Sequence, residues 1–170
     1  IQLSQAETTD FARATRIYAF VRDQVAHTFD IKGNIVTCAA SEVLQHRQGI
    51  CFAKSHLLAA LLRSIGIPTG LCYQRLLFEQ ENAPEFTLHG LNAVYLDSID
   101  RWIRVDARGN KPGVQAEFSL EQEMLAFPIR AELNETDDSR VYSQPNSNVI
   151  AALRKSTTIA QLIQNLPDEL

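Results

Sequence analysis

Cysteine is scarce in this 170-residue chain, which has only Cys38, Cys51 and Cys72. An odd, sparse set excludes a small fold held together by disulfides and leaves at least one thiol free. No two cysteines have the Cys-x-x-Cys spacing of a zinc or redox site, so no metal is expected. The sequence also has no nucleotide-binding motif, and it therefore predicts no cofactor.

The chain also lacks an excess of positive charge and a long apolar run. Lys and Arg number 16 against 20 Asp and Glu, for a formal net charge of −4. With this balance, the chain has no excess of positive charge that would attract nucleic acid or an anionic membrane. No apolar run approaches the roughly 18 residues of a spanning helix. No signal peptide is visible either, so we expect a cytoplasmic protein. This expectation covers residues 1–170 alone, because the sequence begins at Ile1 rather than Met.

What is present is an ordinary globular composition, 45% hydrophobic and 21% charged. The length predicts a single domain over residues 1–170. We expect its core at about residues 40–112, followed by a C-terminal extension over residues 113–170. Nothing in the sequence indicates an oligomeric state.

Hydrophobic spacing predicts helices first and strands afterwards. The expected elements are helices at 9–27, 42–48 and 50–64 and strands at 71–78, 88–96 and 101–105. Ser41 is the expected cap of the second helix and Gly49 its end. The third helix is apolar on every face at 57–62, which is typical of a buried central helix. A four-residue hairpin connection joins the last two strands. This order predicts an α+β fold with helices packed on an antiparallel sheet.

The pattern is weaker beyond residue 109. We expect a short helix at 119–125 and helical stretches between 149 and 166, with a break near Ser156. The mostly polar segment 134–148 is predicted to be a long loop outside the hydrophobic core.

Cys51 stands in the first turn of the predicted buried helix. A helix N-terminus carries partial positive charge and unpaired N–H groups, which favour a thiolate and can hold an oxyanion. Gly49 allows a sharp bend before the helix. The alternative is a small buried apolar cysteine, the commonest role of a free thiol. Cys38 and Cys72 have no flanking motif and are interpreted as structural.

His89 and Asp106 are predicted at the same end of neighbouring strands. In a hairpin turning at 97–100, His89 opposes a residue near 108, within reach of Asp106. A carboxylate there can fix the imidazole tautomer and stabilise the imidazolium. The alternatives are a structural histidine and an aspartate that caps the following loop.

Three blocks of this sequence together resemble the transglutaminase-like superfamily. QGICFAKSHLLAALLRSIGIPTG resembles the family's nucleophile helix and the Gly-Ile-Pro after it, LHGLNAVYL its histidine strand, and WIRVD its aspartate strand. The blocks cover about residues 40–112 in the family's order. The resemblance implies a papain-like cysteine proteinase fold, the transglutaminase core, and a catalytic triad of Cys51, His89 and Asp106.

The chain departs from the family at two points. Leu91 stands where the family usually has a Trp, which bears on substrate shape more than on chemistry. The flanking β-domains and calcium sites of animal transglutaminases are missing, so protein crosslinking is not implied.

Other polar residues are weaker candidates. Gln45 lies six residues before Cys51, the spacing at which papain-like enzymes place a glutamine as oxyanion donor. His56 follows Cys51 by five residues, a net helical rotation of about 140°, so it faces elsewhere and is a poor base. His27 and His46 stand in polar surroundings and are predicted at the surface.

The leading hypothesis is an acyl-transfer enzyme acting on a peptide, a protein side chain or a small amide through a thioester. Water would resolve the thioester in a cysteine peptidase or amidase, and an amine in a transglutaminase. We expect hydrolysis, because the chain shows no obvious amine-binding element. The alternative from another class is a catalytically inert module that binds or assembles through this fold, and thiol reactivity separates the two. The Cys and His spacing disfavours a metal-binding protein.

Overall fold

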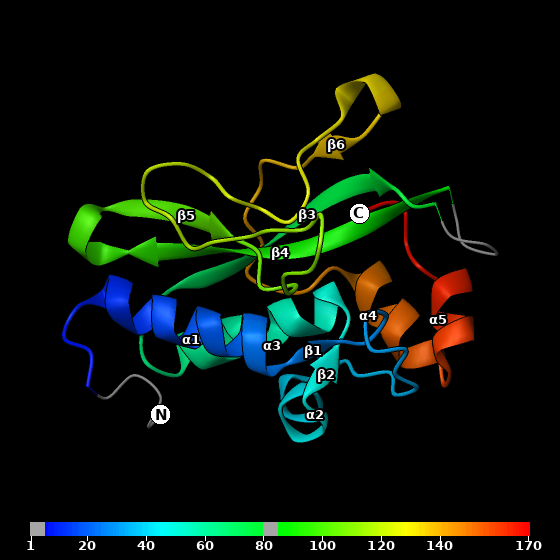
Figure 1. Ribbon diagram of the computed structural model, residues 1–170, viewed down its shortest axis with the longest axis horizontal. Coiled ribbons are helices and arrows are strands. Elements are labelled where there is room, and N and C mark those ends of the chain that lie inside the picture. Colours follow the sequence, from blue (N-terminus) through cyan, green and yellow to red (C-terminus); the bar gives the residue numbers. More distant parts are fainter. Residues whose placement is uncertain (1–5, 80–84) are drawn as a thin grey trace.

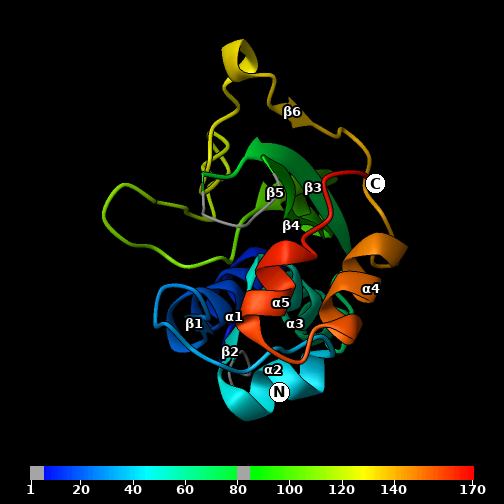
Figure 2. The ribbon, with the colours of Figure 1, turned by 90° about the vertical axis from the view of Figure 1, so that its right-hand side faces the viewer.

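The computed structural model describes residues 6–79 and 85–170. A four-stranded antiparallel sheet, in the order β5-β4-β3-β6, lies over helices α1 and α3 (Figures 1 and 2). The strands are β3 (Thr69–Leu77), β4 (Phe86–Leu96), β5 (Arg101–Val105) and β6 (Thr136–Asp137). The helices are α1 (Asp10–Gln24), α2 (Ala40–His46), α3 (Cys51–Arg63), α4 (Ser147–Lys155) and α5 (Ile159–Gln164). Two-residue strands β1 (Ala26–His27) and β2 (Gln48–Gly49) pair in parallel.

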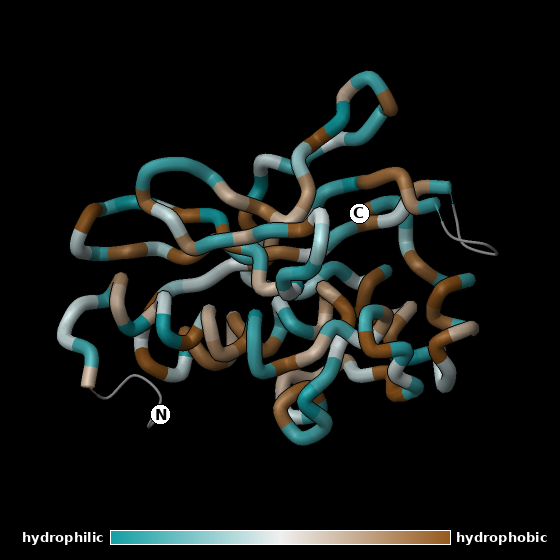
Figure 3. Tube along the Cα trace, viewed as in Figure 1, coloured by the Kyte–Doolittle hydropathy of each residue, from teal (hydrophilic) through white to brown (hydrophobic). Residues whose placement is uncertain are grey.

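Helix α3 is central, as its apolar run predicts. Leu57, Leu58 and Leu62 are at most 1% exposed and pack with Ile17 of α1 and Val94 of β4. In Figure 3, hydrophobic stretches recur along the helices beneath the sheet, whereas the segment around β6 is mostly hydrophilic. Among the described residues, no helix is long and apolar enough to cross a bilayer.

The predicted hairpin register is confirmed. Leu96 pairs with Arg101 and Asn92 with Val105 across β4 and β5. The connection is a single 3-10 turn, Asp97–Ile99, followed by Asp100 in the left-handed region at φ 50°. Residue 106 therefore follows β5 at the end where His89 lies in β4.

The short helix before Cys51 begins and ends at other residues than predicted. Its N-cap is Ala39, and Ser41 lies inside it. The Glu42 carboxylate accepts the backbone N–H of Cys38 and of Ala39, at 2.8 and 2.9 Å, which makes a cap by Ser41 unnecessary. The helix ends at His46, with Arg47 as its C-cap in the left-handed region (φ 53°), and Gly49 belongs to β2. Gly49 serves close packing instead, since an added Cβ would lie 3.1 Å from the Cβ of Ala53.

For the C-terminal part, one prediction is wrong and another is confirmed with an addition. Residues 119–125 form no helix and run irregularly, with Met124 bridged to Glu117. The segment 134–148 is mostly loop and contributes no residue to the buried hydrophobic core, as predicted, but β6 within it pairs with Gln74 and Arg75 at the open edge of β3. An unpaired edge offers N–H and C=O groups that a neighbouring segment can satisfy.

The same polar segment also contributes buried groups. Tyr142 exchanges two 2.8 Å backbone hydrogen bonds with Leu71 and packs against buried residues. The Glu135 carboxylate is 4% exposed and accepts the N–H of Leu77 and of Arg130. Helix α4 begins within the segment at Ser147, where Asn146 caps it.

The last two helices, with the predicted break at Ser156, lie beside α3 on the same side of the sheet (Figure 2). Val149, Leu153 and Leu162 are at most 3% exposed and share one apolar cluster with Ile50 and Phe52. Past α5, the Pro167 carbonyl accepts the N–H of Leu88 at 2.7 Å. The chain end thereby extends the hydrogen bonding of β4 beyond the reach of β5.

Candidate active site

Cys51 is the first residue of α3 and is half-buried at a cavity of about 570 Å³. The N-cap Ile50 is extended and has no capping side chain. The first intrahelical bond runs from the Lys54 N–H to the Ile50 carbonyl. The N–H groups of the first turn therefore have no partner within the helix and lie beside the thiol.

A glycine brings β4 onto this helix start. A Cβ at Gly90 would lie 2.7 Å from Cδ1 and 3.2 Å from Cα of Phe52, closer than a side chain tolerates. Asn92, fully buried two residues on, donates through Nδ2 to the Ser55 carbonyl at 3.0 Å and to the Gly70 carbonyl at 3.1 Å. These contacts fix β4 against α3 and so set His89 beside Cys51.

His89 and Asp106 form a buried pair. The imidazole Nε2 lies 2.7 Å from Oδ2 of Asp106, and the two side chains are 6% and 0% exposed. The carboxylate also accepts the N–H of Arg108 at 3.0 Å and of Ala126 at 3.2 Å. The Phe127 ring stands edge-on to the imidazole at 5.0 Å. Because Nε2 is bonded to Asp106, Nδ1 is the ring nitrogen left for Cys51.

The electrostatics of this pair favour charge despite burial. Burial disfavours an imidazolium, but Asp106 and Cys51 outweigh it and raise the pKa of His89 to about 10. Burial likewise penalises the Asp106 carboxylate, yet His89 and two backbone N–H groups hold its pKa below the ordinary value. The pair is therefore imidazolium and carboxylate at neutral pH.

Both apolar and charged residues line the cavity. Phe29, Leu76, Phe78, Leu88 and Leu166 are among the apolar residues that line it. Among the charged lining residues, Arg108 forms a bidentate ion pair with Asp30, at 2.6 and 2.8 Å. The Lys111 ammonium also donates to Asp30, at 2.8 Å. Such a cavity suits a substrate with an apolar body and a polar end.

The structure brings Cys51 and His89 to one cavity with Asp106 behind them, and it leaves the other predicted residues elsewhere. Gln45 is exposed on α2 and is not among the residues that line the cavity. His56 is buried and bonded to the Cys38 carbonyl at 2.9 Å, and His46 is exposed.

The prediction that His27 is a surface residue is wrong. It is 8% exposed and lines the cavity, because β1 runs alongside β2, the strand just before Cys51. Its polar neighbours in the sequence gave no sign of this, since the burial comes from pairing with a distant segment.

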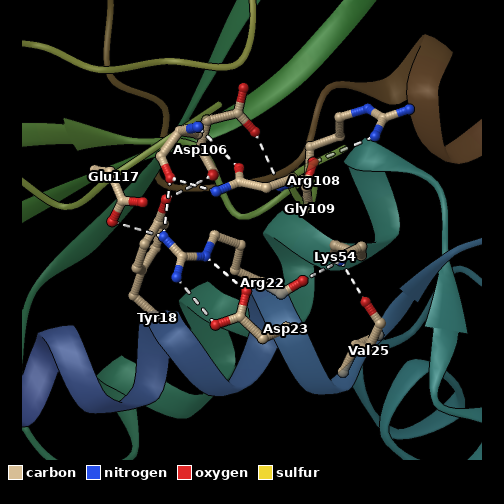
Figure 4. Close-up of polar contacts among 11 residues, drawn as sticks. Tyr18, Arg22, Asp23, Val25, Lys54, Asp106, Arg108, Gly109 and Glu117 are labelled. Carbon is tan, nitrogen blue, oxygen red and sulfur yellow. Dashed lines mark hydrogen bonds and ion pairs between the residues drawn. The ribbon is translucent and has the colours of Figure 1, made fainter. Parts of the chain in front are cut away.

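Sequence reasoning also missed a polar layer behind Asp106, drawn in Figure 4. Lys54 is fully buried, and its Nζ donates to the carbonyls of Arg22 (3.3 Å) and Val25 at the end of α1. Burial, then the charge of Arg108, lowers the pKa of Lys54 to about 7. The Tyr18 hydroxyl donates to the Asp106 carbonyl at 3.0 Å. The Tyr18 bond holds the Asp106 backbone against α1, and the Lys54 bonds tie α3 to the end of α1.

A helix-borne cysteine facing a histidine and an aspartate on a sheet defines a papain-like arrangement. The family model of the transglutaminase-like superfamily matches residues 1–107, and the chain belongs to that superfamily. No curated protein matches the chain.

Three solved structures resemble it. A candidate cysteine protease from Cytophaga hutchinsonii is 24% identical (62% of this chain, 34% of that one, TM-score 0.45). A TGase is 13% identical (69% and 31%, TM-score 0.50), and the M. smegmatis arylamine N-acetyl transferase is 17% identical (72% and 51%, TM-score 0.49). The chain spans about a third to a half of their lengths. With the family match, the likeness to the TGase confirms the predicted papain-like, transglutaminase-core fold.

Proposed function

We propose that this chain is a thiol-dependent acyl-transfer enzyme with Cys51 as nucleophile, His89 as acid and base, and Asp106 as the group that orients His89. The observation that carries the proposal is the buried 2.7 Å pair of His89 and Asp106, set beside a cysteine that begins a helix. Nucleophile, base and orienting carboxylate in this geometry are what acyl transfer requires.

In the first half-reaction, the Cys51 thiolate attacks the carbonyl carbon of an amide and a C–S bond forms. The resulting oxyanion is held by the unpaired N–H groups at the start of α3. As the C–N bond breaks, His89 gives its Nδ1 proton to the departing amine, leaving a thioester on Cys51. Asp106 stabilises the imidazolium throughout.

In the second half-reaction, His89 takes a proton from the acceptor as it attacks the thioester carbon. With water as acceptor, a carboxylic acid leaves and the Cys51 thiolate returns, which is peptidase or amidase chemistry. With an amine, a new amide forms, as in a transglutaminase. We propose hydrolysis, which the lack of an obvious amine-binding element in the sequence supports. The substrate is a peptide, protein or small amide with an apolar body, because the residues that line the cavity are largely apolar.

The test is mass spectrometry of a panel of glutamine peptides and small amides incubated with the protein, with and without primary amines. The proposal expects a carboxylic acid product from the wild type, little amine incorporation and no product from Cys51→Ala. Amine incorporation in preference to hydrolysis would replace the hydrolytic assignment by the transglutaminase one. If no peptide or amide in the panel is converted and Cys51 is unreactive, the result would favour a catalytically inert binding module.

A further inference from the structure

His27 is a second histidine at the cavity, with no role in the reaction described above. It lies in β1 in register with Gly49, two residues before Cys51, and shares the cavity wall with Cys51 and His89. Its ring packs edge-on against Phe29, with centroids 5.4 Å apart. Within residues 6–79 and 85–170 neither ring nitrogen has a hydrogen-bond partner, and only Nδ1 is sealed from solvent-accessible space. Buried polar side chains are normally paired, so a histidine with two unpaired ring nitrogens still has hydrogen-bonding capacity, and Nε2 is the nitrogen that can offer it to the cavity.

The protonation state of His27 follows from its surroundings. Burial lowers the pKa of His27 well below the ordinary value, and the positive charges of Arg108, Lys54 and His89 act in the same direction. Asp30 opposes them but is already held by Arg108 and Lys111. The ring is therefore neutral at neutral pH and carries one proton.

The position of that proton can be inferred from the burial of the two nitrogens. A buried N–H without an acceptor is rarer in proteins than an under-used acceptor, so the proton is disfavoured on the sealed Nδ1. The ring proton is therefore placed on Nε2, the nitrogen that is open to the cavity. The two histidines at the cavity thus have different roles. His89 is charged and transfers protons, whereas His27 is neutral and only donates a hydrogen bond.

We propose that the His27 Nε2–H donates to the oxyanion formed when Cys51 attacks a carbonyl, alongside the N–H groups at the start of α3. The inference rests on the proposed acyl-transfer function. It assigns to His27 the role of oxyanion donor. The spacing of six residues before Cys51 suggests that role for Gln45, but Gln45 is exposed on α2. A fixed neutral donor in a buried site is effective because it needs no reorganisation as the charge develops.

The experiment compares two reactions of Cys51 in the same variants. Acylation by p-nitrophenyl acetate passes through an oxyanion, and its leaving group needs no proton from His89. Alkylation by iodoacetamide displaces iodide at a saturated carbon and forms no oxyanion. Removing one oxyanion donor costs about 10²–10³-fold in rate. We therefore expect His27→Phe to slow acylation by about that factor, with alkylation within about threefold of wild type.

Glutamine and asparagine provide a matched pair in case the phenylalanine variant does not fold. The amide nitrogen of His27→Gln extends to the position of Nε2, whereas that of His27→Asn falls at the position of Nδ1. Acylation should be largely retained in His27→Gln and lost in His27→Asn, with circular dichroism showing both folded. Equal acylation in the two, or a parallel loss of alkylation, would overturn the role. A wild type that forms no acetyl adduct on Cys51 would instead refute the acyl-transfer function itself.

Discussion

At the scale of the residue, Cys51 differs from the other two cysteines in both access and electrostatics. It is half-buried at the cavity, whereas Cys38 and Cys72 are buried. Burial raises the pKa of the Cys38 thiol and raises that of Cys72 to about 11, so neither forms a thiolate readily. Of the three thiols, that of Cys51 interacts with an imidazole, His89. The His56 ring near Cys38 is bonded to the Cys38 backbone carbonyl and not to its thiol.

We predict that brief iodoacetamide treatment near neutral pH labels Cys51 at least about tenfold faster than the other two thiols. Peptide mapping by mass spectrometry after short exposures measures the order of labelling. Cys51→Ser should be almost unlabelled over the same period. Labelling of Cys38 or Cys72 at the rate of Cys51 would contradict the assignment of the nucleophile.

The sequence indicates Cys51, His89 and Asp106 as candidates because each stands near a boundary of a predicted element: the start of a helix or the end of a hairpin strand. His27 and Lys54 give no such signal. Lys54 reads as one polar residue in an apolar helix, and its partners Arg22 and Val25 lie 32 and 29 positions away. Contacts over such separations depend on tertiary packing, which spacing does not encode.

At the scale of the element, the contact of β4 with the start of α3 depends on Gly90. We predict that Gly90→Ala destabilises the fold by about 1–3 kcal/mol through overpacking and lowers kcat/KM, since it pushes His89 from Cys51. Urea unfolding and turnover measure the two effects. Gly66→Ala is the control, because its Cβ meets nothing within 4 Å and only the strain at φ +81° remains. Full activity in folded Gly90→Ala would show that this contact does not set the site.

Lys54 on α3 predicts a dependence of stability on pH. Its pKa is about 7 in the folded chain and ordinarily 10.5, so between these values the unfolded chain binds more protons. Stability from this group therefore rises with pH across that window. The free energy of unfolding of wild type relative to Lys54→Met should rise by about 2 kcal/mol from pH 7 to pH 9. The exposed Lys155→Met should show no such rise, and a flat difference for Lys54→Met would refute the shifted pKa.

Elements differ in how far the sequence predicts them. Helices α1 and α3 and strands β3, β4 and β5 fall within a few residues of their predicted bounds, since periodicity and a four-residue turn define them locally. Strand β6 has only two residues and exists because β3 offers an open edge. The irregular run through 119–125 is likewise positioned by contacts such as Arg101 to the Leu120 carbonyl, at 2.7 Å.

At the scale of the whole molecule, α4 and α5 pack on residues that flank Cys51. Leu153 is 3% exposed within the cluster that includes Ile50 and Phe52. We predict that Leu153→Ala costs about 2–5 kcal/mol, as expected for a core leucine. Leu170→Ala, at a side chain 40% exposed, should be nearly neutral. Urea unfolding compares the two, and equal small effects would mean that the last helices are not part of the stable core.

The central claim is that a charged Asp106 orients His89 for catalysis, and Asp106→Asn tests it most directly. An asparagine oxygen can still accept the N–H of Arg108, so the variant should fold, as circular dichroism would show. It cannot supply the negative charge that stabilises the imidazolium. On any amide that the wild type turns over, we expect kcat/KM to fall by about 10²–10³-fold, less than in serine triads because a thiolate–imidazolium pair partly forms beforehand. A folded Asp106→Asn enzyme within about threefold of wild-type kcat/KM would contradict the account and leave Cys51 and His89 to act without Asp106.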